Sequence, residues 1–415
     1  MALVCIVALG APAVARSQQM LIPMDLSQTN HLKAYGLAYR ALARGNTVQW
    51  LLNYRGGSFL MPMSKENVLE ARLRNVSFEQ TSGSQVTKIR EIIEKNNMET
   101  VVLEKAPRIA VYIPPISQPW DDAVTLAMTY AEIPYDKIFD EDVLNNKLSR
   151  YDWIHLHHED FTGQYGKFYA AYRTAEWYQH EVADFEDRAA RLGFKKVSDE
   201  KKAVAEKIRE YVFDGGFMFA MCSACDTYDI ALAAHGIDIV PPEFDYDGIT
   251  PNAQSRLDYS RCFAFTGFHI ITNPFVYEFS DIDTSDYARA RGAEHDYFTL
   301  FQFSAKYDPV PTMLTQNHVN VVKGFLGQTT GFKKDLVKKS VVILGEDAVH
   351  GEVKYLHGNF GRGTFTFLGG HDPEDYQHAV GDPPTDLSLH PNSPGYRLIL
   401  NNVLFPAARK KKIKT

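Results

Sequence analysis

The sequence has few cysteines, no excess of positive charge and no long apolar run beyond its first fifteen residues. Only 4 of its 415 residues are Cys, and its formal net charge is -7. An acidic chain lacks the positive field that attracts phosphates, so nucleic acid is not an expected partner. Because no later run reaches the roughly 18 apolar residues that span a bilayer, we expect no transmembrane span. Internal repeats and low-complexity segments are also absent from the sequence.

The composition is that of a globular protein, with 45% hydrophobic and 23% charged residues. At roughly 150 residues per domain, the length fits two or three domains, or one large α/β unit with insertions. Either arrangement is long enough to bury a full hydrophobic core.

The N-terminus has the pattern of a secretory leader. Residues 1–15 are apolar throughout, and Ala-Val-Ala at 13–15 is the small-x-small pattern of a signal peptidase site. We therefore expect a signal peptide at 1–19 and a mature protein that is periplasmic or secreted. At the other end, residues 409–415 form a basic tail, which we interpret as a solvated end.

Removal of the leader leaves three cysteines, Cys222, Cys225 and Cys262. An odd number in a compartment where disulfides persist means that at least one thiol stays free or pairs between chains. Cys222 and Cys225 form a CxxC motif, which is compatible with a redox pair, half of a zinc site without a second CxxC, a passive disulfide or two unreactive thiols.

Strand and helix patterns alternate along the chain. In the N-terminal region, residues 20–106, a strand at 20–24, a helix at 29–44 and a strand at 48–52 indicate a β-α-β unit. Residues 107–408 continue the alternation, with an irregular insertion at about 241–310. We expect an α/β fold with a doubly wound, mostly parallel sheet. The predicted strands of this second region are 108–113, 151–156, 217–221, 341–344, 352–357 and 364–368, with helices at 121–131, 170–192, 198–213, 228–234 and 394–405.

Polar clusters follow three of the predicted strands. Ligands in open parallel sheets bind at the carboxyl ends of strands, where the loops converge. We therefore take these clusters as candidate site residues for binding or catalysis. They are His157-His158-Glu159-Asp160, Cys222-Ser223 and His371-Asp372-Pro373-Glu374.

Cys222 stands between a predicted strand and a helix, as the nucleophile of a strand-turn-helix elbow does. A helix N-terminus there lowers a thiol pKa and offers N–H groups to an oxyanion. His371 would serve as the base and Glu374 as the carboxylate that orients it. Two alternatives stay open. Cys222 can be a buried structural thiol, and residues 372–375 can be the N-cap and acidic first turn of a short helix.

The histidines suggest a second kind of site, one that binds a metal ion. His155, His157 and His158, with Glu159 beside them, are residue types that bind borderline metals, although their spacing matches no standard zinc signature. Hydrogen-bonded loop histidines are the alternative. We expect no metal and no cofactor.

Three segments carry a family resemblance. They resemble the class I glutamine amidotransferase-like superfamily, specifically its ThuA-like branch, from residue 107 to the C-terminus with an insertion. The resemblance implies a flavodoxin-like sheet, with Cys222, His371 and Glu374 at the positions of the nucleophile, base and orienting acid. Both motifs depart from the pattern, because the elbow has Ala at 220 and 224 where the family has Gly, and one extra residue separates His371 from Pro373. The segments are KIREYVFDGGFMFAMCSACD, GRGTFTFLGGHDPEDY and PGYRLILNNVLFPAAR.

The whole chain is also similar to a family of secreted bacterial proteins labelled "asparagine synthetase B". A true glutamine-hydrolysing asparagine synthetase resembles an enzyme with Cys at position 2 and an SGGxDS loop, whereas this chain has Ala2 and no such loop. The segments that carry this second resemblance are NHLKAYGLAYRAL, WLLNYRGGSFL, QPWDDAVTLAMTYAEIPY and LHHEDFTGQYGKFY.

These observations predict a secreted hydrolase or transferase that acts on an amide or carbohydrate-derived small molecule. Its catalytic residues would be Cys222, His371 and Glu374, and its substrate-binding residues His157, His158, Glu159, Ser223 and Asp372. The alternative is a non-catalytic binding or assembly protein of the cell envelope with the same fold and an envelope protein as its partner. Metal-dependent hydrolysis at the His157 cluster is a third hypothesis.

Overall fold

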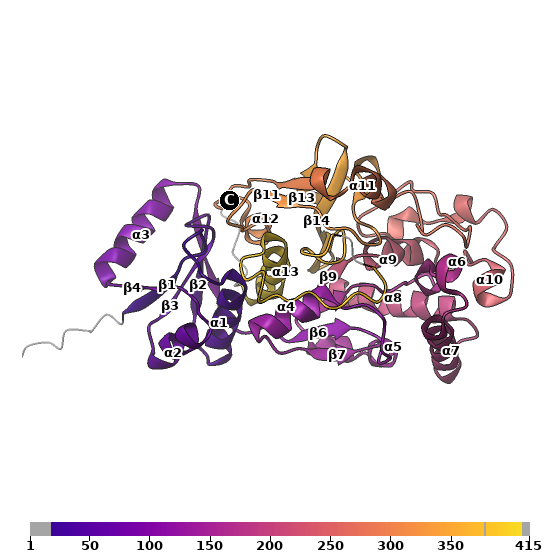
Figure 1. Ribbon diagram of the computed structural model, residues 1–415, viewed down its shortest axis with the longest axis horizontal. Helices are drawn as coiled ribbons and strands as arrows, with labels where there is room; N and C mark the ends of the chain where they lie inside the picture. The colour runs from indigo at the N-terminus through magenta and orange to yellow at the C-terminus, as the bar shows by residue number, and fades with distance from the viewer. Residues whose placement is uncertain (1–17, 377–378, 409–415) are drawn as a thin grey trace, which may run out of the picture.

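The computed structural model describes residues 18–376 and 379–408, which form two sheets separated by helices (Figure 1). The basic tail and all but the last two residues of the predicted signal peptide lie outside this range. Within the described residues, none of the helices combines the length and apolar composition that a membrane span needs.

The N-terminal region forms a five-stranded antiparallel sheet in the order β4-β1-β3-β2-β5. β3 lies between β1 and β2, because a short turn after β2 brings the chain straight back as a hairpin. The expected strand-helix-strand order is present, with a third strand inserted between the two strands. The strands are β1 (Gln19–Ile22), β2 (Val48–Leu52), β3 (Ser58–Pro62), β4 (Glu79–Thr81) and β5 (Glu99–Leu103), and the helices are α1 (His31–Ala43), α2 (Lys65–Leu73) and α3 (Gly83–Lys95).

The larger sheet has ten strands, and five of them form a parallel half in the order β15-β9-β8-β6-β7. Alternate side chains enter different cores: Ile109 and Val111 pack on one face of the sheet, and Ala110 and Tyr112 on the other. Burial on both faces explains the continuous apolar runs that the sequence shows here. The parallel strands are β6 (Ile109–Tyr112), β7 (Asp136–Ile138), β8 (Trp153–Leu156), β9 (Phe217–Met221) and β15 (Gly363–Leu368).

The other half of this sheet is antiparallel, so the sheet is mixed rather than mostly parallel. The reason is the length of the connections: β14 and β15 are joined through Gly361 and Arg362 alone, and a parallel crossover needs about a dozen residues. Within the irregular insertion, an isolated antiparallel bridge joins Ile270 to Ser280. The remaining strands are β10 (Tyr297–Leu300), β11 (Val321–Lys323), β12 (Phe332–Lys333), β13 (Val342–Asp347) and β14 (Glu352–Phe360).

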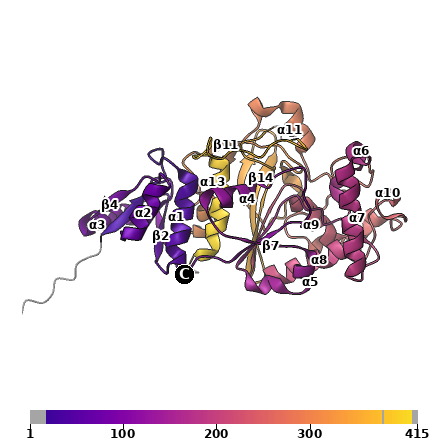
Figure 2. The ribbon, with the colours of Figure 1, turned by 60° about the horizontal axis from the view of Figure 1, so that its bottom comes forward.

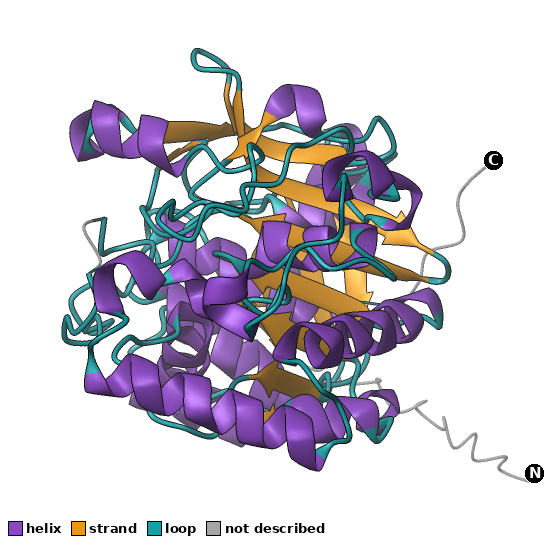
Figure 3. Ribbon diagram, turned by 90° about the vertical axis from the view of Figure 1, so that its right-hand side faces the viewer, coloured by secondary structure: helices purple, strands orange, loops and turns teal. Residues whose placement is uncertain are grey.

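Helices cover both faces of the parallel half. α1, α4 and α13 pack on one another over one face, where α1 also joins the N-terminal sheet to the main core (Figure 2). α5, α8 and α9 cover the opposite face, and Figure 3 shows how the helices surround the strands. The helices of the larger region are α4 (Ala123–Ala131), α5 (Asp140–Leu144), α6 (Tyr169–Tyr172), α7 (Glu176–Arg191), α8 (Val197–Phe213), α9 (Ala224–Ala233), α10 (Pro242–Asp245), α11 (Ser285–Arg291), α12 (Pro309–Leu314) and α13 (Pro394–Leu404).

A buried ion pair joins α8 to the carboxyl end of the parallel strands. Lys201 Nζ lies 3.0 Å from Asp140 Oδ2 and 3.0 Å from the Tyr112 hydroxyl, and its side chain is 1% exposed. Glu159 and Glu200 lie near the same ammonium group, and burial raises the pKa of each to about 8. Lys201 is therefore the cation on which this acidic cluster depends.

We expect Lys201→Met to lower the free energy of unfolding by about 3–5 kcal/mol, because it leaves Asp140 buried without a counter-ion. The matched control is Lys207→Met on the same helix. Lys207 pairs with Glu210 at the surface, so this change should cost less than about 1 kcal/mol. Urea denaturation of both variants measures the difference. Equal losses would contradict the assignment of Lys201 as the buried counter-ion.

Candidate functional site

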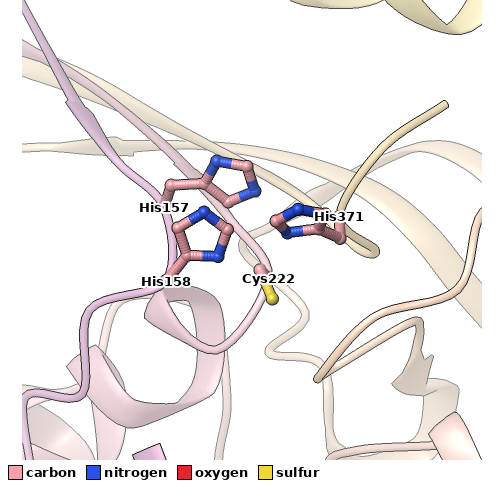
Figure 4. Close-up of side chains that lie close together, drawn as sticks. All are labelled: His157, His158, Cys222 and His371. Atoms are coloured by element: carbon pink, nitrogen blue, oxygen red, sulfur yellow. The ribbon is translucent and has the colours of Figure 1, made fainter. Parts of the chain in front are cut away.

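Four predicted site residues meet at the carboxyl ends of three neighbouring parallel strands (Figure 4). His157 and His158 follow β8, Cys222 follows β9, and His371 lies just beyond β15. One nitrogen or sulfur atom from each lies within 4.8 Å of those of the other three. His157, Cys222 and His371 are only 1%, 4% and 2% exposed, so the cluster is buried.

The three imidazole rings are in direct contact. The ring centroids of His157 and His158 are 3.8 Å apart and nearly parallel, at an angle of 15°. The His371 ring lies 4.7 Å from His157 and 4.4 Å from His158. Burial, together with repulsion from the other two rings, holds the pKa of His158 well below its usual range. The group is therefore a source of imidazole nitrogen lone pairs.

Cys222 occupies a strained turn between β9 and α9. Its φ is +55°, a left-handed conformation that a residue with a side chain rarely adopts. Such strain persists only where the surrounding structure enforces it, and it is common at catalytic sites. Burial raises the pKa of the Cys222 thiol to about 12, although the backbone N–H groups of Ser223 and Gln328 oppose this rise. Those two donors face the sulfur and favour negative charge on it.

The first turn of α9 fixes the loop that carries the two adjacent histidines. Ala224 N–H donates to the carbonyl of His157 at 3.0 Å, and Ser223 Oγ donates to the carbonyl of His158 at 2.8 Å. Thr227 Oγ1 donates to the carbonyl of Glu159 at 3.0 Å. Ser223, predicted to bind substrate, is fully buried and positions the histidine loop instead.

Two consecutive carboxylates at the start of α4 hold the histidines. Asp122 caps the helix by accepting from Thr125 N–H, and its Oδ2 lies 3.2 Å from His157 Nδ1. Asp121 Oδ1 lies 3.3 Å from His371 Nε2, and the Asp121 carbonyl accepts from His158 Nε2 at 2.7 Å. Burial alone would raise the pKa of Asp122, but His157 and His155 hold it well below the usual range, so Asp122 is ionised.

The sequence analysis predicted that Glu374 orients His371, but in the structure its side chain points elsewhere. The Asp372 carboxylate accepts from Glu374 N–H at 2.8 Å, and this turn directs the Glu374 side chain to His390, 3.2 Å away. Asp121 is the carboxylate beside His371. Asp372 is fully buried and closes the turn rather than facing the cluster.

Glu159 also leaves the histidine cluster. Its side chain lies near Lys201 in the buried ion cluster and lines a small enclosed cavity beside His158. That cavity is also lined by Trp120 and Glu181, and burial raises the pKa of Glu181 to about 7. Glu159 therefore lines this cavity, and its predicted role in substrate binding stays a prediction.

The sequence analysis missed Asp121 and Asp122. They follow β6, the fourth parallel strand whose carboxyl end reaches the site, and they directly precede a helix. The rule that led to the other clusters, polar residues after an apolar strand, applies to them as well. An eight-residue loop rich in proline, residues 113–120, separates them from the strand and obscures the pattern.

Comparisons with known proteins identify no family. No family model matches the chain, and no curated protein matches it. Among solved structures, it is similar to the cytoplasmic protein STM3548 from Salmonella typhimurium, with 11% identity over 73% of this chain and 100% of the other and a TM-score of 0.35. The cytoplasmic protein STM1381 from Salmonella typhimurium LT2 gives 12% identity over 73% and 100% and a TM-score of 0.37. Gan42B, a GH42 beta-galactosidase, gives 9% identity over 65% and 28% and a TM-score of 0.28.

We expect Gly327→Ala to displace His371. A Cβ at position 327 would lie 2.7 Å from His371 Cβ and 2.8 Å from His371 N, so one of the two loops must move. The cost should be about 1–3 kcal/mol of the free energy of unfolding, as for other overpacked sites. Urea denaturation and the imidazole NMR signals of His371 measure the two effects. In the control Gly248→Ala the new methyl group meets no atom within 4 Å, so an equal effect there would contradict this prediction.

Proposed function

We propose that the chain is a small-molecule hydrolase in which Cys222 is the nucleophile, His371 the base and Asp121 the carboxylate that orients the base. One observation carries the proposal: a cysteine in a left-handed strand-to-helix turn has its sulfur within 4.8 Å of a His371 nitrogen. This combination places a thiol and its proton acceptor together at the carboxyl ends of parallel strands.

The reaction that this arrangement supports is acyl transfer. The thiol proton passes to His371, and the sulfur forms a bond with the carbonyl carbon of an amide. The amine then leaves with the proton from His371, and water hydrolyses the thioester. The N–H groups of Ser223 and Gln328 stabilise the negative charge on the sulfur before attack. Amides and carbohydrate-derived carbonyl compounds remain the proposed substrates.

The fold proposal is a doubly wound, flavodoxin-like sheet of the amidotransferase-like kind, with an antiparallel extension. Its support is the order β7-β6-β8-β9-β15, which corresponds to the order 2-1-3-4-5 of flavodoxin-like sheets. In such sheets ligands bind at the strand ends next to the point where the order reverses. β6 and β8 flank that point here, and Asp121, His157 and His158 follow them. Secretion is also a proposal, and its support is the apolar sequence of residues 1–15.

Burial of the thiol favours the second candidate function, a non-catalytic envelope binding protein. Cys222 is 4% exposed, and a substrate carbonyl must reach it. Chemical reactivity separates the two candidates, because an activated thiol reacts with an alkylating reagent while a structural thiol does not.

The test is the rate of iodoacetamide labelling at Cys222 in the purified chain at neutral pH, after treatment with a chelator. Cys262 is an internal control, since it is buried and free and lies outside the cluster. We expect Cys222 to label faster than Cys262, and His371→Gln to slow this labelling by about 100-fold, the lower end for loss of a general base. Asp121→Asn should also slow labelling.

The control variant is His357→Gln, which replaces another buried histidine on β14. It should leave the labelling of Cys222 unchanged. The proposal fails if Cys222 labels no faster than Cys262, or if His371→Gln and His357→Gln behave alike. Either result would favour the binding protein.

A further inference from the structure

The histidine–cysteine cluster contains two more imidazoles than a thiol nucleophile needs. His371 suffices as the base for Cys222, yet His157 and His158 lie against the same ring. Three imidazoles and a thiol form the donor set that borderline-soft divalent cations prefer, and four such ligands complete a tetrahedral zinc site. The unused histidines therefore suggest a ligand of the protein rather than a second base.

A hydrogen bond sets the tautomer that a metal ligand needs in His158, and a neighbouring carboxylate favours it in His157. The Asp121 carbonyl can only accept, so His158 carries its proton on Nε2 and its lone pair on Nδ1. The Asp122 carboxylate lies at Nδ1 of His157, which leaves the lone pair on Nε2. Both ring nitrogens of His157 are buried, and neither has a hydrogen-bond partner among the described residues, although Nδ1 has the Asp122 carboxylate 3.2 Å away. Metal-bound histidines are commonly held through their second nitrogen by carboxylates and carbonyls in this way.

The spacing of the four ligand atoms is close to that of a tetrahedral ion site. With Zn–N bonds of about 2.0–2.1 Å and Zn–S bonds of about 2.3 Å, tetrahedral ligand atoms lie about 3.3–3.6 Å apart. The four ligand atoms lie within 4.8 Å of one another, so contractions of about 1 Å complete the site. Changes of side-chain torsion angles in His157, His158 and Cys222 can supply such movements.

Two acidic clusters in the described residues already contain a cation from the protein. Lys196 Nζ lies 3.0 Å from Asp245 Oδ2 and also contacts Asp238 and Asp247. In the other cluster, Arg291 pairs with Glu352 at 2.7 Å and with Asp296 at 3.2 Å. Among the described residues, no ion pair joins a Lys or Arg to His157, His158 or Cys222, while the Asp122 and Asp121 carboxylates lie 3.2 Å from His157 and 3.3 Å from His371.

We infer that His157, His158, Cys222 and His371 bind Zn²⁺, and that the ion regulates the thiol. Binding breaks the S–H bond of Cys222, forms a Zn–S bond and releases the proton to solvent. While zinc is bound, the sulfur lone pair is engaged and His371 is a ligand, so neither can act in acyl transfer. This regulation rests on the proposed function, since it concerns the same thiol, but the metal site itself does not.

The test uses the purified chain, freed of metal with a chelator, and then Zn²⁺ or Co²⁺ alone. We expect one zinc per chain, and a Co²⁺ complex with a thiolate charge-transfer band in the near ultraviolet. His157→Ala and His158→Ala should each weaken zinc binding by about 100-fold or more, since loss of even an outer-shell partner costs about 10–100-fold. Cys222→Ser should remove the charge-transfer band. His357→Gln and Cys262→Ser are the matched controls and should bind zinc like the unaltered chain.

The labelling rate of Cys222 with and without zinc separates the two proposals. Protection by zinc that a chelator reverses supports both. Rapid labelling without any zinc binding overturns the metal site and leaves the hydrolase proposal intact. Zinc binding with slow labelling after chelation supports the metal site and overturns the nucleophile. Zinc binding that none of the cluster variants weakens, or a Co²⁺ complex of the unaltered chain without the thiolate band, overturns the inference even if one variant fails to fold.

Discussion

Asp121 and Asp122 place three oxygen atoms against the three histidines of the site. The side chains of these two residues and the Asp121 carbonyl contact His371, His157 and His158 within 3.3 Å. The same carboxylate of Asp122 caps α4, so the first turn of one helix fixes both the direction of the chain and the orientation of the rings. Imidazoles in contact would rotate apart without such partners. The orientation of the three rings therefore depends on this acidic pair.

The first turn of α9 supplies a second constraint from the opposite side of the cluster. Hydrogen bonds from this turn hold the carbonyls of residues 157–159, and the same turn begins with Cys222 in its left-handed conformation. Movement of the histidine loop would thus disturb the turn that presents the thiol. The strain at Cys222 is compensated by these bonds and by the burial of α9, in which every residue is buried.

Sequence patterns predicted the strands and site residues correctly where one local rule determines the structure. The apolar run at 217–221 and the polar residues after it predicted β9 and the place of Cys222, and the same reasoning brought His157, His158 and His371 to one edge. The antiparallel half was missed because apolar strands look alike in either direction, and the short connections from β13 to β14 and from β14 to β15 are what reveal the hairpins. Glu374 was misassigned because sequence proximity to His371 does not show that Asp372 turns the chain away. Asp121, 250 residues distant in sequence from His371, could only be paired with it through the fold.

Acyl transfer and zinc binding, the two reactions proposed for Cys222, both use a lone pair of its sulfur atom. A buried thiol loses its proton and becomes a thiolate only if a cation or a proton acceptor lies next to it. His371 provides the acceptor, and a divalent ion held by the three histidines provides a stronger alternative. Because zinc replaces the proton on sulfur, its affinity must rise as proton concentration falls, whereas transfer to His371 leaves the number of bound protons unchanged. Under the two proposals together, one arrangement of four side chains would provide a reactive thiol when metal is scarce and a closed metal site when it is present.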